Sequence, residues 1–420
     1  MNTSTFAKTI VSHWSVIAVV AVLIYYSIFS HEFQLYWDDQ WQVINSMTND
    51  GISLKNLQTI FHSISNGQYS PINQLYYTLI HLCFGYSSLA FHIFNACLVY
   101  LLAYSFIRNH FDSKKALGIS FFTALLFAIH PVQVETVCWI SASKIVLSTF
   151  FYLSALICYI QYMRNSKWQY LLASVVSSIL AMGCKEQSVI IVPCLLLFDW
   201  MLFKRNMRSL KVYIEKVYYL IPAIAIFIVT LVANKNTGEE IIGYTIVDRF
   251  IFLCYSSFKY LLISAIPFKL SYLYPFPFQV GEKIPMALWI YPFVILFIGY
   301  VIYLNRRKPL LVFCTLFFIL HLLPVLHVIP LPRYVVAADR YLYIPYIAFA
   351  IGLSILSYHL YERQRKWILY AGFLYCSYLC VYTAGYAPAW KNSDTLKEHF
   401  KEVLKKRETN LSINFKHEKQ

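Results

Sequence analysis

Two adjacent carboxylates follow the first long apolar stretch of the chain, in the string LYWDDQW. The aromatic residues beside Asp38 and Asp39 favour the membrane–water interface, where a ring can be buried while its polar atom stays wet. Neighbouring carboxylates repel each other, so the pKa of at least one should rise. A carboxylate near a low-dielectric wall can act as a general base toward a hydroxyl group. The alternative is a solvated loop start in which an aspartate caps a helix.

A second acidic site lies in the string HPVQVETVCWISASK. Pro131 disfavours helix at His130, so an apolar helix should end there. Glu135 follows in a stretch too short to leave the interface. Ionisable groups so close to lipid are costly unless paired, which makes His130 and Glu135 functional candidates. The alternatives are a structural pairing for His130 and, for Lys144 at the end of the string, a role as an interfacial anchor.

Charged residues return in two later strings, MGCKEQS and LPRYVVAADRYLYIP. The first places Lys185 and Glu186 in a turn between apolar stretches, and the second supplies Arg333, Asp339 and Arg340. A lysine ammonium is a compact phosphate ligand, and an arginine guanidinium binds phosphate oxygens in a planar fork. We expect these residues to bind substrate. A surface turn pair and a structural salt bridge are the respective alternatives.

An aromatic, proline-rich segment, 268–285, reads FKLSYLYPFPFQVGEKIP. Its rings could line a groove for a lipid or a sugar, or the segment could be a rigid connector. The ten cysteines form no CxxC pair and have no metal-ligand spacing, so they indicate small apolar core residues.

Apolar helices must position these residues. The chain is 59% hydrophobic and 13% charged, whereas soluble domains average about 25% charged residues. Apolar runs recur at about the length that a helix needs to cross a bilayer, which predicts an all-α, polytopic transmembrane helical bundle with about 11–13 spans. Segments 71–85 and 249–265 are ambiguous. The candidate spans are 14–30, 87–107, 117–130, 145–162, 168–183, 187–203, 217–233, 286–304, 309–326, 342–358 and 367–385.

The basic residues indicate which ends of these spans face the cytoplasm. Positive loops stay inside, so the N-terminus should be cytoplasmic and the C-terminus should lie outside. The outer loop 31–86 and the turns that carry the other candidate residues then share the outer face. This pattern also explains the net charge of +15 without nucleic acid as a partner. The basic loops are 108–116, 163–168, 204–216, 305–308 and 361–366.

Taken in order, the strings LYWDDQW, FAIHPVQVETVCWISASK, GCKEQSV and VVAADRYLYIPYIAF resemble the GT-C superfamily of integral-membrane glycosyltransferases. The closer resemblance is to the transmembrane O-mannosyltransferases that carry tetratricopeptide repeats, and to their bacterial relatives. We expect one glycosyltransferase-like membrane domain over 1–390. The residue pattern and the odd number of spans predict a short amphipathic tail on the outer side over 391–420. In that tail we expect Ser393 or Asp394 to cap a helix with a stripe of Leu396, Phe400, Val403 and Leu404.

The resemblance also implies an activity. A sugar would move, with inversion, from a polyprenyl-phosphate donor to a hydroxyl of a glycan, lipid or protein on the outer face of a bacterial inner membrane. By this resemblance Asp38, Asp39 and Glu135 would be catalytic, and Lys185, Glu186 and Arg340 match the later motifs as substrate-binding residues. His130, Arg333 and Asp339 are expected to bind substrate from their charge and position alone. No cofactor is certain, although Asp39 and Glu135 could hold a divalent cation, as in some members of the superfamily.

Two departures weaken the family pattern. The string Tyr69-Ser70-Pro71 stands where relatives often have YRP, and the repeats thought to handle a protein acceptor are absent. A transporter or flippase of lipid-linked sugars is one alternative, although transporters often show inverted repeats and we find none. A non-catalytic assembly protein of the membrane is the other.

Overall fold

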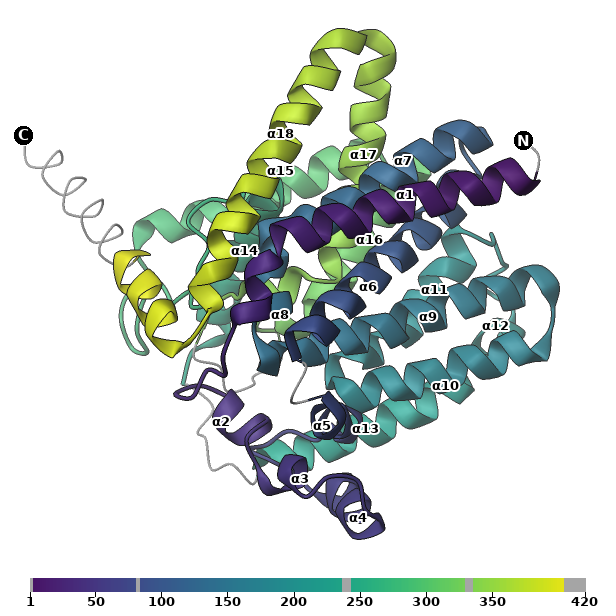
Figure 1. The fold of residues 1–420 in the computed structure, drawn as a ribbon. Helices are drawn as coiled ribbons and strands as arrows, with labels where there is room; N and C mark the ends of the chain where they lie inside the picture. The colour runs from purple at the N-terminus through teal and green to yellow at the C-terminus, as the bar shows by residue number, and fades with distance from the viewer. Residues whose placement is uncertain (1–2, 81–83, 236–242, 329–334, 404–420) are drawn as a thin grey trace, which may run out of the picture.

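The structure is a computed structural model that describes residues 3–80, 84–235, 243–328 and 335–403. Within these ranges the chain is built from α-helices and short 3-10 helices, and the β-type pairings are two isolated bridges, Ser65 with Gln68 and Tyr274 with Ala337. The predicted all-α fold class is confirmed. Figure 1 shows the helices as one bundle with α17 and α18 projecting from it.

The first half of the described chain contributes α1 (Thr3–Ile24), η1 (Tyr26–Ser30), α2 (Asp39–Gln42), α3 (Ser46–Asn49), α4 (Leu54–His62), α5 (Pro71–Ile80), α6 (Phe84–Ile107), α7 (Ser113–Ile129), η2 (Pro131–Gln133), α8 (Val134–Cys138), η3 (Ile140–Ala142), α9 (Ser143–Asn165), α10 (Trp168–Cys184), η4 (Glu186–Ile190) and α11 (Ile191–Met201). The second half contributes α12 (Leu210–Ile214), α13 (Val217–Lys235), α14 (Ile246–Ala265), η5 (Met286–Trp289), α15 (Ile290–Leu304), α16 (Pro309–Leu322), η6 (Leu323–Val325), η7 (Asp339–Leu342), α17 (Pro345–Arg363), α18 (Arg365–Tyr386) and η8 (Ala387–Trp390).

Several helices are suited to a bilayer, which confirms a polytopic membrane protein. Of the described residues, five helices are long and apolar enough to cross, or six if α7 and the helix that follows it, bent by 50°, form one span. Three further apolar helices are shorter, at 10–17 residues. The bend and these short helices account for part of the difference from the about 11–13 predicted spans, whereas α14 and α17, at 20 and 19 residues, are long enough but not apolar enough to be included. The five are Ser4–Ile24, Gly85–Ile107, Ile140–Asn165, Met286–Leu304 and Arg365–Trp390.

The centre of the bundle is formed by α6, α7, α9, α10 and α17. Helix α9 packs along both α6 and α10, and α7 lies between α6 and α17. The buried core between them is rich in tyrosine, and its largest fully buried side chains include Tyr100, Tyr152, Tyr159, Tyr343 and Tyr346. Packing around this buried core holds the helices in fixed positions relative to one another. The candidate residues lie at the ends of these helices and in the turns beside them.

The two ambiguous segments differ in length. Segment 71–85 contains α5, a ten-residue helix that is about 15 Å long, half the thickness of a bilayer core. It packs against α10 and the short helices α3 and α4, rather than standing as a separate span. Segment 249–265 belongs to α14, which has 20 residues and packs mainly on α15.

The predicted amphipathic tail helix is present over 393–403. Its N-cap is different from the prediction, because the side chain of Asn392 accepts a hydrogen bond from the backbone N–H of Thr395 at 3.1 Å. Leu396 and Val403 are buried, as the stripe predicts. Leu404 lies outside the described residues. Ser393 instead accepts a bond from the backbone of Tyr36, which ties the tail to the loop that carries Asp38.

Candidate functional site

Asp39 is fully buried and tied to a distant part of the chain. One carboxylate oxygen accepts a bond from the backbone N–H of Gln34 at 2.8 Å. The other accepts bonds from the backbone N–H of Ser141 at 3.1 Å and from its hydroxyl. Burial raises the pKa of Asp39 to about 6, although the bonds from Ser141 and Gln34 oppose the rise. The pKa is therefore raised at Asp39 as predicted, but the cause is burial and not the repulsion between neighbouring carboxylates that the sequence suggested.

Asp38 is more exposed than its neighbour and belongs to a different hydrogen-bond chain. Its Oδ2 accepts a bond from the Nε2 of Gln42 at 3.3 Å. The Oε1 of Gln42 in turn accepts a bond from the Nζ of Lys144 at 3.0 Å, and Gln68 accepts a second bond from the same Nζ at 2.7 Å. This series of hydrogen bonds holds Asp38 beside the start of α9 while leaving its side chain half-buried.

Lys144 lies at the centre of the candidate residues. Its side chain is buried, and its charge interacts with those of Lys185, Asp38, Glu186 and Arg340. The string that contains Lys144 left open whether it is an anchor or part of the site, and the burial argues against a side chain that merely snorkels to water. Sequence reasoning missed Gln42 and Gln68, because neutral amides in a loop carry no signal until their partner is known.

Glu135 and Arg340 form a buried ion pair. The guanidinium Nη1 of Arg340 contacts the Oε1 of Glu135, and the backbone N–H of Arg340 donates to Oε2 at 2.8 Å. Glu135 is fully buried, whereas about a fifth of the Arg340 side chain, 22%, is exposed. The guanidinium also lies over the ring of Trp139, 5.6 Å from its centroid. Glu135 is thus positioned to orient Arg340 rather than to act as a free base.

Lys185 and Arg340 line the same pocket, although they lie far apart in the sequence. The pocket holds about 40 Å³ and also includes Ser148, Tyr152 and His321. Lys185 pairs with Glu186, with an Nζ–Oε1 distance of 2.9 Å. Two cations beside a wall of Ile145, Ile190, Ile344 and Pro345 suit an anionic group attached to an apolar chain.

Two other predicted residues, Asp339 and His130, are buried and form hydrogen bonds within the protein. Asp339 is fully buried and accepts a bond from the hydroxyl of Tyr274 at 2.7 Å. His130 is fully buried, and its Nδ1 accepts a bond from the backbone N–H of Val132 at 3.3 Å, which caps η2. Both side chains are buried in this structure, and their role in substrate binding stays a prediction. Arg333 lies outside the described residues.

The aromatic segment 268–285 is packed into the protein. Tyr272, Tyr274 and Phe278 are buried in the main core. Because the Tyr274 hydroxyl bonds Asp339, the segment connects α14 to the turn that carries Arg340. These contacts favour the rigid connector over the groove.

A divalent cation does not fit Asp39 and Glu135. The carboxylate oxygens of Asp39 accept bonds from Gln34 and Ser141, and those of Glu135 accept bonds from Arg340. A cation would have to displace these donors. No group of three or more His, Cys, Asp or Glu residues suited to a metal occurs in the part of the chain that the structure describes.

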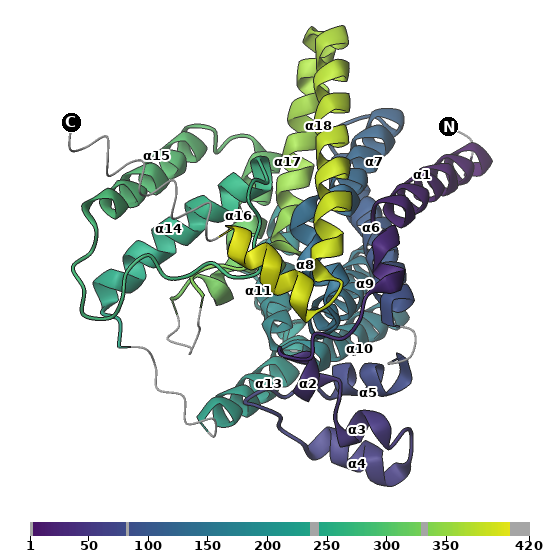
Figure 2. The ribbon, with the colours of Figure 1, turned by 60° about the vertical axis from the view of Figure 1, so that its left-hand side comes forward.

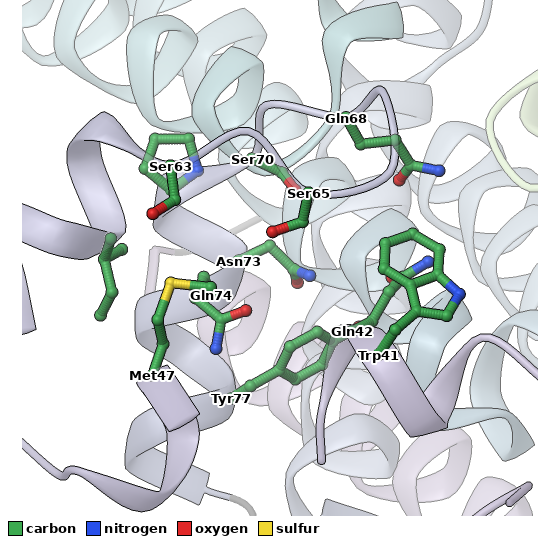
Figure 3. Close-up of a pocket in the computed structure, with 12 residues that line it drawn as sticks. Trp41, Gln42, Met47, Ser63, Ser65, Gln68, Ser70, Asn73, Gln74 and Tyr77 are labelled. Atoms are coloured by element: carbon green, nitrogen blue, oxygen red, sulfur yellow. The ribbon is translucent and has the colours of Figure 1, made fainter. Parts of the chain in front are cut away.

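A polar pocket adjoins Asp38 within the loop 31–86. It holds about 30 Å³, and Figure 3 shows amide and hydroxyl groups around it, with Trp41 at one side. Gln42 and Gln68, the two partners of Lys144, both belong to its wall. Hydroxyls and amides beside an aromatic ring suit a neutral, hydroxyl-bearing ligand. The polar lining residues are Gln42, Ser63, Ser65, Gln68, Ser70, Asn73 and Gln74.

No protein-family model matches the chain. The chain is similar to the protein O-mannosyl-transferase TMTC2 of Mus musculus, with 29% identity over 152 residues, which cover 34% of this chain and 18% of that protein. It is also similar to the protein O-mannosyl-transferase Tmtc1 of Drosophila melanogaster, with 27% identity over 128 residues, 30% of this chain and 15% of that one. The matched regions thus span less than a fifth of the length of these relatives. The similarity supports a membrane glycosyltransferase in general terms.

Proposed function

We propose that this protein is a membrane glycosyltransferase that moves a sugar from a polyprenyl-phosphate donor to a hydroxyl acceptor on the outer face, with inversion. The observation that carries the proposal is the convergence of a half-buried carboxylate, Asp38, with two cations of one pocket, Lys185 and Arg340. A base and a phosphate site are the two parts that such a transfer needs. The similarity to O-mannosyl-transferases supports the same reaction class.

In the proposed mechanism, Asp38 takes the proton from the acceptor hydroxyl. The hydroxyl oxygen attacks the anomeric carbon of the donor sugar, and the bond from that carbon to the phosphate oxygen breaks on the opposite side. Lys185 and Arg340 stabilise the negative charge that develops on the leaving phosphate. Glu135 keeps the guanidinium of Arg340 oriented toward this position.

The remaining groups have supporting roles in the proposal. Asp39 holds the loop against Ser141 and thereby fixes its neighbour Asp38. The polar pocket beside Gln42 receives the acceptor, whose hydroxyl then lies near Asp38. The apolar wall beside Lys185 and Arg340 accommodates the first units of the polyprenyl chain.

The decisive experiment compares Asp38→Asn with Asp50→Asn in membranes that contain a labelled, lipid-linked mannose. Both aspartates lie in the loop 31–86, but Asp50 is exposed and outside the proposed site. Loss of a general base typically costs roughly 10²–10⁴ in rate, so Asp38→Asn should lose transfer to this extent while Asp50→Asn keeps it. Equal transfer by both variants would end the assignment of Asp38, and absence of transfer by the unchanged protein would count against the reaction class.

A further inference from the structure

A large apolar groove separates the helix pair α14–α15 from α16 and α17. It has a volume of about 960 Å³, far larger than the pockets beside Asp38 and Arg340. Helices α14 and α15 pack mainly on each other, and Figure 2 shows this pair beside α16 and α17. A cavity of this size lined by aliphatic side chains needs an apolar occupant, because an unfilled space loses dispersion contacts.

The charge of the groove is confined to one end. Arg307 and Lys308, from the loop between α15 and α16, line this end together with His110 and His359. The rest of the wall is apolar apart from a few small polar residues such as Ser257 and Thr315, and its lining contains no Asp or Glu. An apolar channel with a cationic end is complementary to a lipid with an anionic headgroup.

The cationic end is not the end that faces the candidate active site. Helix α16 begins at Pro309, next to Lys308, and its final turn carries His321, which shares the pocket of Lys185 and Arg340. With 14 residues, α16 is about 21 Å long. A phosphate at Arg307 and Lys308 is therefore a different phosphate from the one proposed to leave beside Arg340. The positive loop 305–308 also suits the cytoplasmic leaflet.

We propose that this groove binds an anionic diacyl phospholipid of the inner leaflet. Its acyl chains lie between α14–α15 and α16–α17, and its phosphate contacts Arg307 and Lys308. Basic recesses between membrane helices on the cytoplasmic side are typical sites for such headgroups. The bound lipid fills the groove and joins the α14–α15 pair to the rest of the bundle. This inference does not depend on the glycosyltransferase activity.

The first test measures binding of phosphatidylglycerol and phosphatidylcholine to the full chain in detergent by native mass spectrometry. Two changes, Arg307→Gln with Lys308→Gln, should weaken phosphatidylglycerol binding by on the order of 30-fold, as expected for two basic residues near a headgroup. Arg363→Gln with Arg365→Gln is the matched control, because these exposed residues end α17 and begin α18 and do not line the groove. Equal weakening in both pairs, or equal binding of the two lipids by the unchanged protein, would overturn the proposal.

The second test fills the groove without changing its charge. Gly352 lines the groove, and a Cβ atom placed on it meets nothing within 4 Å, so Gly352→Leu should occupy the space and expel an acyl chain. Gly372→Leu on α18 is the control, since its Cβ also meets open space but lies outside the groove. Only Gly352→Leu should lose the binding of phosphatidylglycerol. Addition of this lipid should raise the Tm of the unchanged protein and of Gly372→Leu, but not that of Gly352→Leu. Unchanged binding in Gly352→Leu would overturn the proposal.

A third measurement distinguishes the phospholipid from the proposed donor. Polyprenyl phosphate is added to the same variants, and its binding is measured in the same way. If Arg307→Gln with Lys308→Gln weakens polyprenyl phosphate as strongly as phosphatidylglycerol, the groove belongs to the donor lipid and the proposal is wrong. Selective loss of phosphatidylglycerol supports it.

Discussion

At the scale of single residues, Asp38 and Asp39 are neighbours in the chain but have different surroundings. Asp39 is fully buried, with donors from Gln34 and Ser141, whereas Asp38 is half-buried and accepts a bond from Gln42. The first arrangement holds a loop in place, and the second leaves a carboxylate within reach of a substrate. This difference is why the proposed base is Asp38.

The surroundings of Asp39 predict a pH dependence of stability. Its pKa is about 6 in the folded protein against 3.8 ordinarily, so the folded state binds more protons than the unfolded state between these values. The contribution of Asp39 to stability should therefore be fully present below about pH 4 and be lost as the pH rises through 6, by at most about 3 kcal/mol. Thermal unfolding of Asp39→Asn in detergent at pH 4, 5 and 6 should show a smaller fall than the unchanged protein. The same fall in both would show that Asp39 is not its source.

The ion pair of Glu135 and Arg340 predicts non-additive stability. Removing one partner of a buried pair leaves the other charge unpaired, which costs about 3–5 kcal/mol. Glu135→Gln should therefore destabilise the protein strongly, and Glu135→Gln combined with Arg340→Gln should be less destabilised than the sum of the two single changes. Thermal unfolding of the four proteins checks this, and additive losses would contradict a direct pair.

At the scale of elements, the bend after α7 brings Glu135 to the site. The side chain of His130 caps the 3-10 turn that begins at Pro131, and the chain turns by 50° there. Two short helical turns then lead to Ser141, the partner of Asp39, and to Lys144 at the start of α9. The short helical segments after this bend, together with the start of α9, thus supply the contacts that hold the loop of Asp38 against the bundle.

Lys144 is the link between α9 and that loop, which predicts a role in positioning. Lys144→Met should lower the transfer rate at least tenfold, because a hydrogen bond to a charged group is worth about 1.5–3 kcal/mol and Gln42 would no longer hold Asp38. The exposed Lys114 on α7 offers the control Lys114→Met, which should keep full activity. Transfer in membranes with labelled donor measures both. A normal rate in Lys144→Met would show that Asp38 is positioned without it.

At the scale of the whole molecule, the proposed site depends on which ends of the helices face outward. The structure brings the charged strings together, and the basic loops predict that this face is outside. The loop 31–86 and the loop that contains Asn206 should therefore lie on opposite sides of the membrane.

Thiol labelling of intact cells tests this orientation. Asn66 and Asn206 are both exposed, so each can be changed to cysteine after the accessible native cysteines are replaced by serine. A membrane-impermeant reagent should label Asn66→Cys from outside, and label Asn206→Cys only after the membrane is opened. The reverse pattern would place the candidate site on the cytoplasmic side.

The amino-acid sequence by itself determined the fold class and the strings that carry the chemistry. Long apolar stretches require helices, because a backbone within lipid must satisfy its own hydrogen bonds. Charges that interrupt such stretches are costly, so Asp38, Glu135, Lys185 and Arg340 were recognisable as candidates without any contacts. These are properties of local composition.

Only the tertiary structure decided how those residues are paired. It decided that Asp39 is buried rather than Asp38. It also decided that Glu135 pairs with Arg340 and that two glutamines surround Lys144, and these contacts join segments that are distant in the sequence. Which side chains meet depends on how helices pack against one another, and residue type alone does not specify that packing. The same reason explains the groove at Arg307 and Lys308, whose walls come mainly from the four helices α14, α15, α16 and α17 and whose shape no single segment reveals.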